Sequence, residues 1–143
     1  MPDTFLDTSF AIALVSPRDQ HHSLAREWSG AIRQASGRLV TTTGVLLEIG
    51  NGLCAPHRRV AAHRLIESIE LDPTIHVVEI EPVLRARARR LYGARPDKSW
   101  GLVDCASFVV MRERGLTDAL TADHHFEQAG FRALLRGEAP ASR

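Results

Sequence analysis

The chain has 143 residues and a formal net charge of +1, and 44% of its residues are hydrophobic while 24% are charged. This length favours one domain with a single core, and the composition excludes an intrinsically disordered chain. A net charge so close to zero excludes attraction of a polyanion by overall charge alone, so such a partner would have to be bound by a local basic patch.

The chain carries no recognisable targeting or membrane segment. Its first residues lack a basic stretch followed by a long apolar run, and no stretch reaches the roughly 18 apolar residues that cross a bilayer. We therefore expect a cytoplasmic protein with no membrane partner. Cys54 and Cys105 are isolated and have no CxxC spacing, which argues against a disulfide framework or a zinc site. Both thiols are expected to be reduced and packed.

The N-terminal part of the chain predicts two strands and two helices. A short strand over 5–7 ends at an aspartate and leads into a helix that is capped by Thr8 or Ser9. Apolar residues at 3.6-residue spacing predict an amphipathic helix over 22–35. A second short strand follows at 39–40.

Two further helices follow this second strand. The threonines at 41–43 offer hydroxyl caps for a helix that carries Glu48 among apolar residues and ends at Pro56. Neighbours in a helix lie about 100° apart around its axis, so the apolar residues beside Glu48 do not prove that it is buried. The apolar pattern over 60–71 predicts the second amphipathic helix.

A strand and a strongly basic helix come next. The β-branched run 76–80 is the clearest strand in the chain. The helix over 82–93 has a proline in its first turn and carries a basic cluster that continues beyond its end. This cluster has two interpretations, a solvated helix face or a groove for a phosphate backbone. The side chains assigned to such a groove are Arg85, Arg89, Arg95 and Lys98.

The rest of the chain is organised around the stretch 97–126. It predicts a helix that opens with Asp104 and stops at Gly115, a short strand at 119–120, and a helix that begins at Asp123. Beyond it, a last edge strand is expected at Leu134 and Leu135, and a frayed tail over 137–143, so that the domain covers 1–136. Strands that alternate with helices at this spacing predict an α/β fold, with a parallel sheet and helices on both faces.

Four acids are expected to meet at one edge of this sheet. Asp7 and Asp123 follow the C-terminal ends of strands, where such sheets bind ligands, and Glu48 and Asp104 lie on helices that can overhang the same edge. Carboxylates about 4 Å apart repel by roughly 4 kcal/mol at an effective dielectric near 20, and no obvious cation lies between them in the sequence. A divalent ion would remove this cost, and an all-oxygen set suits Mg²⁺ or Mn²⁺ better than zinc.

Each acid also has a purely structural interpretation. Asp104 and Asp123 can cap or stabilise the helices that they begin. Asp7 is an acceptable turn residue, and Glu48 an ordinary solvated helix residue. The histidines at 124–125 diverge on a helix, so we expect them at the surface rather than as joint metal ligands.

Four motifs resemble those of the PIN-domain ribonucleases, and closely those of the VapC-type toxins of bacterial toxin–antitoxin pairs. Each motif is weak alone, but the four occur in order, with the separations of that family, over nearly the whole chain. The chain departs from the family pattern at Trp100-Gly101, where more aliphatic residues are expected. The motifs are FLDTS at 5–9, TGVLLE at 43–48, LVDCASF at 102–108 and LTADHHF at 120–126, followed by Gly130-Phe131.

The resemblance implies a single PIN-like domain with a five-stranded parallel sheet flanked by helices on both faces. It implies an acidic site that binds one or two Mg²⁺ or Mn²⁺ ions and hydrolyses RNA phosphodiester bonds, formed by Asp7, Glu48, Asp104 and Asp123. It also implies a small cognate antitoxin and a homodimer. Asp97 matches a position that is acidic in some relatives and is expected to be an accessory acid.

Further residues are expected to assist the four acids. Hydroxyl groups that hydrogen-bond to metal-binding carboxylates fix their orientation, and the candidates here are Thr8, Ser9 and Thr121. The basic cluster would bind the RNA backbone through Arg85, Arg89, Arg95 and Lys98.

Two other classes of function remain open. One is a PIN-like scaffold that binds RNA or a protein without cleaving, although such a scaffold has no use for four mutually repelling carboxylates. The other is a phosphomonoesterase of similar α/β layout, but the run 7–9 lacks the second aspartate of a DxD phosphatase.

Overall fold

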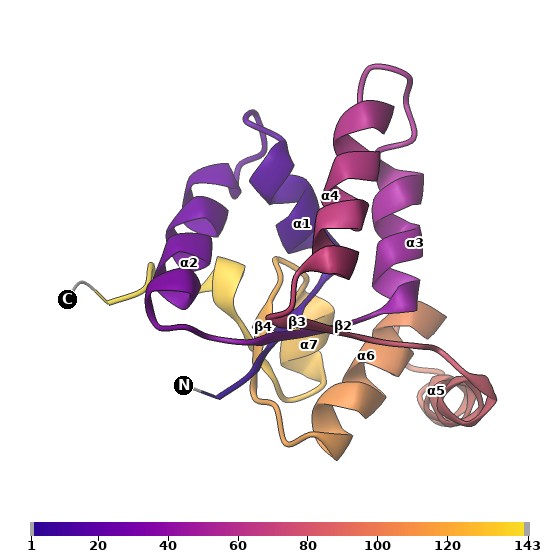
Figure 1. Ribbon diagram of the computed structural model, residues 1–143. Coiled ribbons are helices and arrows are strands. Elements are labelled where there is room, and N and C mark those ends of the chain that lie inside the picture. The colour runs from indigo at the N-terminus through magenta and orange to yellow at the C-terminus, as the bar shows by residue number, and fades with distance from the viewer. Residues whose placement is uncertain (1, 142–143) are drawn as a thin grey trace.

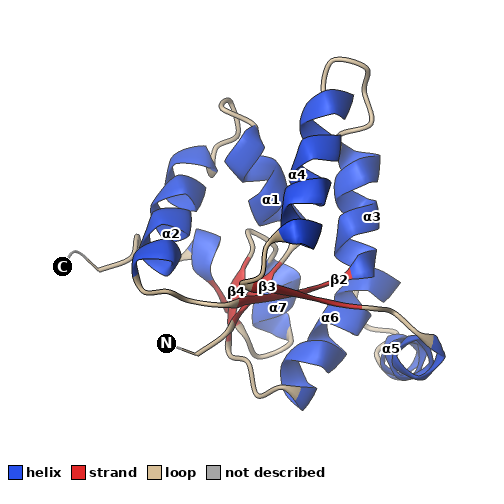
Figure 2. Cartoon of the chain, in the orientation of Figure 1, coloured by secondary structure: helices blue, strands red, loops and turns tan. Residues whose placement is uncertain are grey.

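The computed structural model describes residues 2–141, which contain one five-stranded sheet with the strand order β3-β2-β1-β4-β5 (Figures 1 and 2). Every pair of neighbouring strands is parallel. The prediction of a five-stranded parallel sheet is therefore confirmed. The strands are β1 (Thr4–Leu6), β2 (Leu39–Thr42), β3 (Ile75–Val78), β4 (Asp118–Leu120) and β5 (Arg132–Ala133).

Helices cover both faces of the sheet, as predicted. In Figure 1 the first four helices lie above the sheet, while α6 and α7 lie below it and α5 is seen end-on beside α6. A short 3-10 helix, η1 (Leu134–Arg136), follows β5. The α-helices are α1 (Thr8–Val15), α2 (His22–Gln34), α3 (Thr43–Gly52), α4 (Arg59–Leu71), α5 (Pro82–Ala94), α6 (Leu102–Glu113) and α7 (His124–Gln128).

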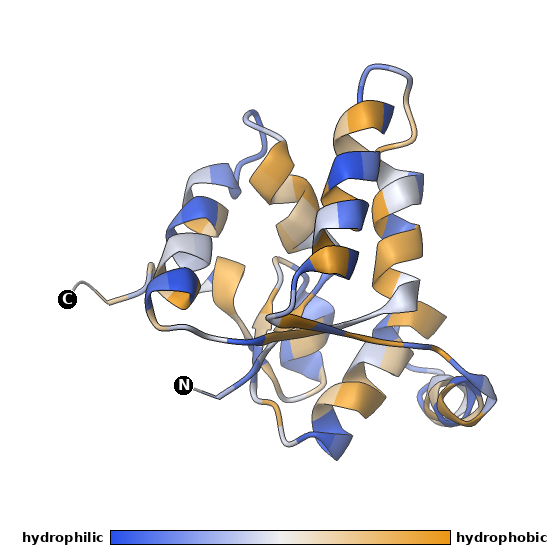
Figure 3. Cartoon of the chain, in the orientation of Figure 1, coloured by the Kyte–Doolittle hydropathy of each residue, from blue (hydrophilic) through white to orange (hydrophobic). Residues whose placement is uncertain are grey.

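The core lies on both sides of β1, the central strand, all of whose residues are buried. Hydrophobic residues recur along the strands and the flanking helices (Figure 3), and the buried ones form a core cluster. Below it, the ring of Phe126 on α7 lies 6.1 Å from the ring of Phe5 and 5.0 Å from that of Phe108 on α6, the latter at 87°. Such edge-to-face packing fixes how α6 and α7 lie against β1.

A glycine allows α3 to lie close to α6. A side chain at Gly44, in the first turn of α3, would place its Cβ 2.7 Å from Ile80 Cδ1 and 3.3 Å from Val103 Cγ1. Real Cβ atoms essentially never come within 3.0 Å of another atom, so a larger residue would force the side chain of Ile80 to shift and would press on Val103 of α6. The helix that carries Glu48 therefore packs against the start of the helix that carries Asp104.

Several predicted boundaries were wrong. Asp7, rather than Thr8 or Ser9, occupies the N-cap position of α1, and its side chain makes no capping hydrogen bond there. Helix α3 ends at Gly52, before Pro56 is reached. The last strand is β5 rather than the expected strand at 134–135, where both leucines are buried in a 3-10 helix.

Other predictions concern the cysteines, the membrane and the tail. Cys105 is buried, but Cys54 is exposed at the end of α3, so the prediction that both are packed was wrong. Among residues 2–141, no helix combines the length and apolar character needed to span a bilayer. Residues 137–141 contain no helix or strand, whereas 142–143 lie outside the described part of the chain.

Candidate active site

The four predicted acids lie at the C-terminal edge of the sheet. Asp7 directly follows β1, and Asp123 follows the neighbouring parallel strand β4. Glu48 lies in the second turn of α3, and Asp104 in the first turn of α6. Repulsion from Asp104 contributes to raising the pKa of both Asp7 and Glu48, and repulsion from Asp123 does so for Glu48 and Asp104. The structure thus brings these four carboxylates together.

Asp7 is the most deeply buried of the four. Burial raises its pKa from 3.8 to about 7, and repulsion from Asp104 and Glu48 adds to this. Hydrogen bonds from Thr121 and from the backbone N–H of Thr8 lower the pKa and so oppose this shift. Thr121 Oγ1 donates to Asp7 Oδ2 at 2.7 Å, and Ser9 Oγ donates to the same oxygen at 3.3 Å. A charge at this position is costly unless a cation is supplied.

The three predicted hydroxyl residues all contact the acid cluster or its backbone. Thr8 Oγ1 donates to Glu48 Oε1 at 2.8 Å. Ser9 Oγ lies 3.1 Å from Thr121 Oγ1 and accepts the backbone N–H of Ala122 at 2.9 Å. Thr121 Oγ1 also accepts the backbone N–H of Asp123 at 3.0 Å. The loop after β4 is thereby tied to the start of α1, which holds Asp7 and Asp123 at a fixed separation.

His125 lies in the site, so the prediction of a surface position was wrong for this residue. Only 18% of its side chain is exposed, and its Nδ1 lies 3.1 Å from Asp104 Oδ2 and 3.3 Å from Asp123 Oδ1. His124, by contrast, is 57% exposed. Helical side chains point back towards the helix N-terminus. His125, the second residue of α7, is therefore directed at Asp123, the N-cap of that helix. The sequence Asp-His-His at 123–125 could have predicted this direction.

The capping interpretations of Asp104 and Asp123 are also correct. The backbone N–H of Gly101 donates to Asp104 Oδ2 at 3.2 Å, and that of His125 donates to Asp123 Oδ1 at 2.9 Å. Burial is the main cause of the raised pKa of Asp104, and the bonds from Gly101 and His125 oppose it. Capping holds each side chain in place and does not use up its capacity for ligands, because a carboxylate has two oxygens.

Each of the four acids is held by the protein through one of its two oxygens. In residues 2–141, the side-chain and capping hydrogen bonds described above converge on a single oxygen of each carboxylate. The second oxygen is left to bind a ligand, and an oriented set of such oxygens suits a hard divalent cation. The oxygens held by the protein are Asp7 Oδ2, Glu48 Oε1, Asp104 Oδ2 and Asp123 Oδ1.

A second group of potential ligand atoms lies at the outer side of the site. One atom each from Asp123, His124 and His125 lies within 4.8 Å of the others. His125 Nδ1 already contacts two carboxylates, and His124 is largely exposed. The buried carboxylates, whose charges repel one another, have the greater need of a metal ion.

Asp97 lies in a different environment. Its two oxygens accept from Arg95 Nε and Nη2, each at 3.0 Å, and Lys98 Nζ lies 3.6 Å from Oδ2. Arg95 lowers the pKa of Asp97 to about 2. Among the described residues, no hydrogen bond or ion pair joins Asp97 to the four acids. The structure therefore does not bring this predicted accessory acid into the site.

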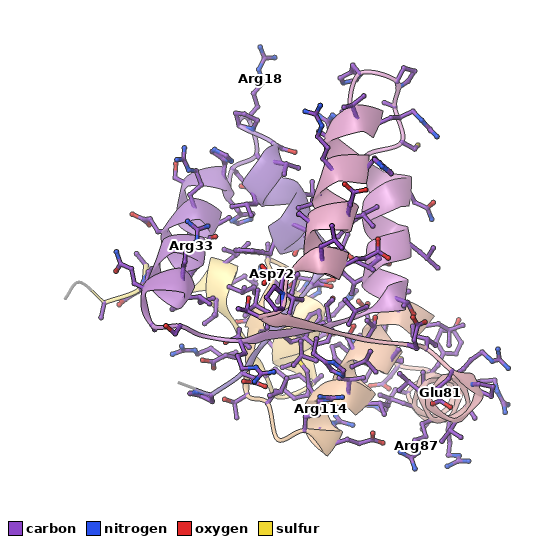
Figure 4. All side chains as sticks on the ribbon, in the orientation of Figure 1. Arg18, Arg33, Asp72, Glu81, Arg87 and Arg114 are labelled. Atoms are coloured by element: carbon purple, nitrogen blue, oxygen red, sulfur yellow. The ribbon has the colours of Figure 1, made fainter. Side chains whose placement is uncertain are left out.

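Some side chains of the basic cluster form ion pairs with acids, and others form none within residues 2–141. Arg95 and Lys98 pair with Asp97, and Arg87, on the lower side of α5 in Figure 4, pairs with Glu113 at the end of α6. Arg85 and Arg89 instead line a groove of about 440 Å³ between α5 and α6. Leu102 and Val103 line the same groove, so it reaches within one residue of Asp104.

Comparisons with known proteins identify the family of this chain. Residues 4–132 match the PIN domain family. The 23S rRNA-specific endonuclease VapC20 of Mycobacterium tuberculosis is 30% identical over 130 residues, which cover 89% of this chain and 94% of that protein. The crystal structure of M. tuberculosis VapC20, described as a sarcin-ricin loop cleaving toxin, matches with a TM-score of 0.78 at 28% identity, covering 90% of this chain and 95% of that one. The chain belongs to the PIN domain family and is a nuclease of the VapC type.

Proposed function

We propose that this protein is the toxin of a toxin–antitoxin pair and cleaves RNA with Mg²⁺ or Mn²⁺ held by the four acids. PIN nucleases generally depend on divalent metal ions. The observation that carries the proposal is the arrangement of Asp7, Glu48, Asp104 and Asp123, which are oriented through one oxygen each and repel one another. Such a cluster is unfavourable on its own and becomes favourable around a cation.

The acids, hydroxyl residues and His125 of the site have different roles in hydrolysis. When bound, a divalent ion lowers the pKa of the attacking water and stabilises the 3′ oxygen that leaves phosphorus. Asp7, Asp104 and Asp123 hold the principal ion, and Thr121 and Ser9 fix the orientation of Asp7. Glu48, oriented by Thr8, helps to hold a second ion or orients the water. His125 holds Asp104 and Asp123 together.

The substrate is single-stranded or looped RNA. The similar VapC20 is named as specific for 23S rRNA and as cleaving the sarcin-ricin loop, so this loop is the first substrate to test. The groove between α5 and α6 supports a path for the RNA backbone, because Arg85 and Arg89 line it beside the helix that carries Asp104. Arg95 and Lys98 contribute less, since Asp97 already neutralises part of their charge.

The partners of the protein are a small antitoxin and a second copy of the chain, and its location is the cytoplasm. We expect the antitoxin to direct a basic side chain at the acids, because a cation there replaces the charge of the metal. Leu47 is 71% exposed beside Glu48, and Leu102 is 53% exposed near Asp104, which supports a protein contact next to the site. The domain responsible covers 1–136.

The test is incubation of the purified chain with total RNA and Mg²⁺ or Mn²⁺, followed by mapping of the cut ends. We expect cleavage at a small number of positions and no cleavage when EDTA is present. Binding of RNA without cleavage under any metal would favour the scaffold. Hydrolysis of small phosphate monoesters with intact RNA would favour the phosphomonoesterase.

A further inference from the structure

We propose that Trp100 and Gln128 form a brace between α6 and α7 that sets the separation of Asp104 and Asp123, and so controls metal affinity from outside the site. This inference rests on the proposed metal site and adds two positioning residues to it. Neither residue contacts the four carboxylates. Trp100 instead holds α6, which carries Asp104 in its first turn, and Gln128 holds α7, whose N-cap is Asp123.

The brace is a hydrogen bond between the ends of two elements. Trp100 Nε1 donates to Gln128 Oε1 at 3.0 Å. Trp100 immediately precedes Gly101, the N-cap of α6, and Gln128 is the last residue of α7. The bond therefore ties the start of α6, and with it Asp104, to the far end of the short helix that Asp123 begins.

The Trp100 ring is held in one orientation. It is only 4% exposed and packs edge-on against Phe108, with 5.0 Å between ring centroids and an interplanar angle of 77°. On its other side, Arg95 Cζ lies 5.2 Å from the ring centroid, and Asp97 holds Arg95 by a two-point ion pair. These contacts leave the indole N–H little freedom to turn away from Gln128. Asp97 thus supports the brace indirectly, because it holds Arg95 against the Trp100 ring.

The brace differs in kind from the other link between these helices. His125 joins Asp104 to Asp123 inside the site, through groups whose charges a bound cation will change. The bond between Trp100 and Gln128 is neutral and lies outside the acid set, so it keeps the helices in place with or without a cation.

The test compares the Mn²⁺ affinity of three variants of the full chain by isothermal titration calorimetry. Trp100→Phe keeps a ring against Phe108 and removes the N–H, while Gln128→Leu removes the acceptor from the other side. We expect each to raise the Mn²⁺ dissociation constant about threefold to tenfold, because helices loosened by the loss of a bond worth about 1 kcal/mol must be ordered again when the ion binds. The double variant should bind no more weakly than either single one, because both remove the same interaction.

A matched control and the melting temperature of the metal-free protein separate positioning from folding. Gln34 ends α2 as Gln128 ends α7, so Gln34→Leu should leave the Mn²⁺ dissociation constant unchanged. A lower melting temperature with unchanged Mn²⁺ affinity in Trp100→Phe and Gln128→Leu would reduce the brace to a packing contact, and additive losses in the double variant would also overturn it. A parent chain that binds no Mn²⁺ would instead overturn the proposed metal site.

Discussion

Asp7 and Asp97 show how differently the same side chain behaves in two regions of this molecule. Asp7 is buried among other acids, and its pKa is raised to about 7. Asp97 lies on an exposed loop between Arg95 and Lys98, and its pKa is lowered to about 2. The loop contains its own cations, whereas the buried cluster gains by binding one from solution. An acid close to the site in sequence is thus not automatically part of it.

The largest effect is expected from Asp104→Asn, which removes one charge from the buried cluster. RNA cleavage should fall by orders of magnitude, because a metal ligand is lost. The metal-free variant should melt no lower than the parent, because burial and repulsion from Asp123 raise the pKa of Asp104 and make its charge unfavourable. Cleavage assays and thermal melts of the metal-free protein measure the two effects.

Metal linkage gives a check on this first prediction. Mg²⁺ or Mn²⁺ should raise the melting temperature of Asp104→Asn less than that of the parent. The asparagine can still accept the backbone N–H of Gly101, so helix capping is kept. A variant that melts lower and still cuts RNA would mean that Asp104 serves only the helix.

The second prediction concerns the pH dependence of stability. Because the pKa of Asp7 rises from 3.8 to about 7 on folding, the folded protein holds this proton more tightly than the unfolded chain. The contribution of Asp7 to stability is thus most favourable below about pH 4, and it is lost as the pH rises to about 7, by roughly 4 kcal/mol in all. Thermal melts of the metal-free parent and Asp7→Asn between about pH 3 and 8 should diverge in favour of the variant over this window.

Added Mg²⁺ sharpens this second comparison. The ion should remove most of the loss in the parent, because it stabilises the charged form of Asp7, and should change the variant much less. If the melting temperatures of the two proteins depended on pH in the same way, folding would not raise the pKa of Asp7, and repulsion within the cluster would not destabilise the fold.

A smaller effect is expected on the groove between α5 and α6. Arg85→Ala and Arg89→Ala should each weaken RNA binding uniformly across sequences and reduce the slope of log affinity against log salt by about 0.7 to 0.9. Arg87→Ala is the matched control on the same helix, because its guanidinium already pairs with Glu113. Equal slopes for all three variants, measured by filter binding or fluorescence anisotropy, would assign the arginines to a solvated helix face.

The smallest effect is expected from Asp97→Asn. Metal affinity and RNA cleavage should change by less than about threefold, because the side chain is exposed and reaches the site only through Arg95 and the Trp100 ring. The ion pair between Asp97 and Arg95 stabilises the fold above about pH 4, and this contribution is lost as the pH falls towards 2. Asp97→Asn should therefore lower the melting temperature at neutral pH and not in acid. Loss of metal binding in this variant would place Asp97 among the ligands.

Much of this arrangement could be predicted from the sequence, because strand ends carry their residues to a shared edge. The parallel direction of the strands follows from the alternation of strands and helices, and the meeting of acids at one edge follows from the places of Asp7 and Asp123, whereas the strand order was not predicted. Side-chain direction was harder to predict. His125 was assigned to the surface because neighbouring helical residues diverge, yet its place two residues after a capping aspartate turns it back into the site.

Short-range pairing was also invisible in the sequence. Arg95 and Lys98 looked like continuations of the basic helix, but Asp97 lies between them in the chain and neutralises part of their charge. At the end of the sheet, a pair of leucines has the composition of a strand. The two lie in a 3-10 helix instead, with both side chains buried, and their composition does not distinguish this helix from a strand.

The sheet order also determines when the acid set becomes complete during synthesis of the chain. β4 pairs with β1, and the hydrogen bond from Thr121 to Asp7 joins residues 114 positions apart. At about 5–20 residues per second, the ribosome needs roughly 6 to 23 seconds to extend the chain from one to the other. During that time Asp7 has neither its hydroxyl donor from β4 nor Asp123 beside it. The chain therefore does not contain its complete acid set until the C-terminal parallel strands have formed.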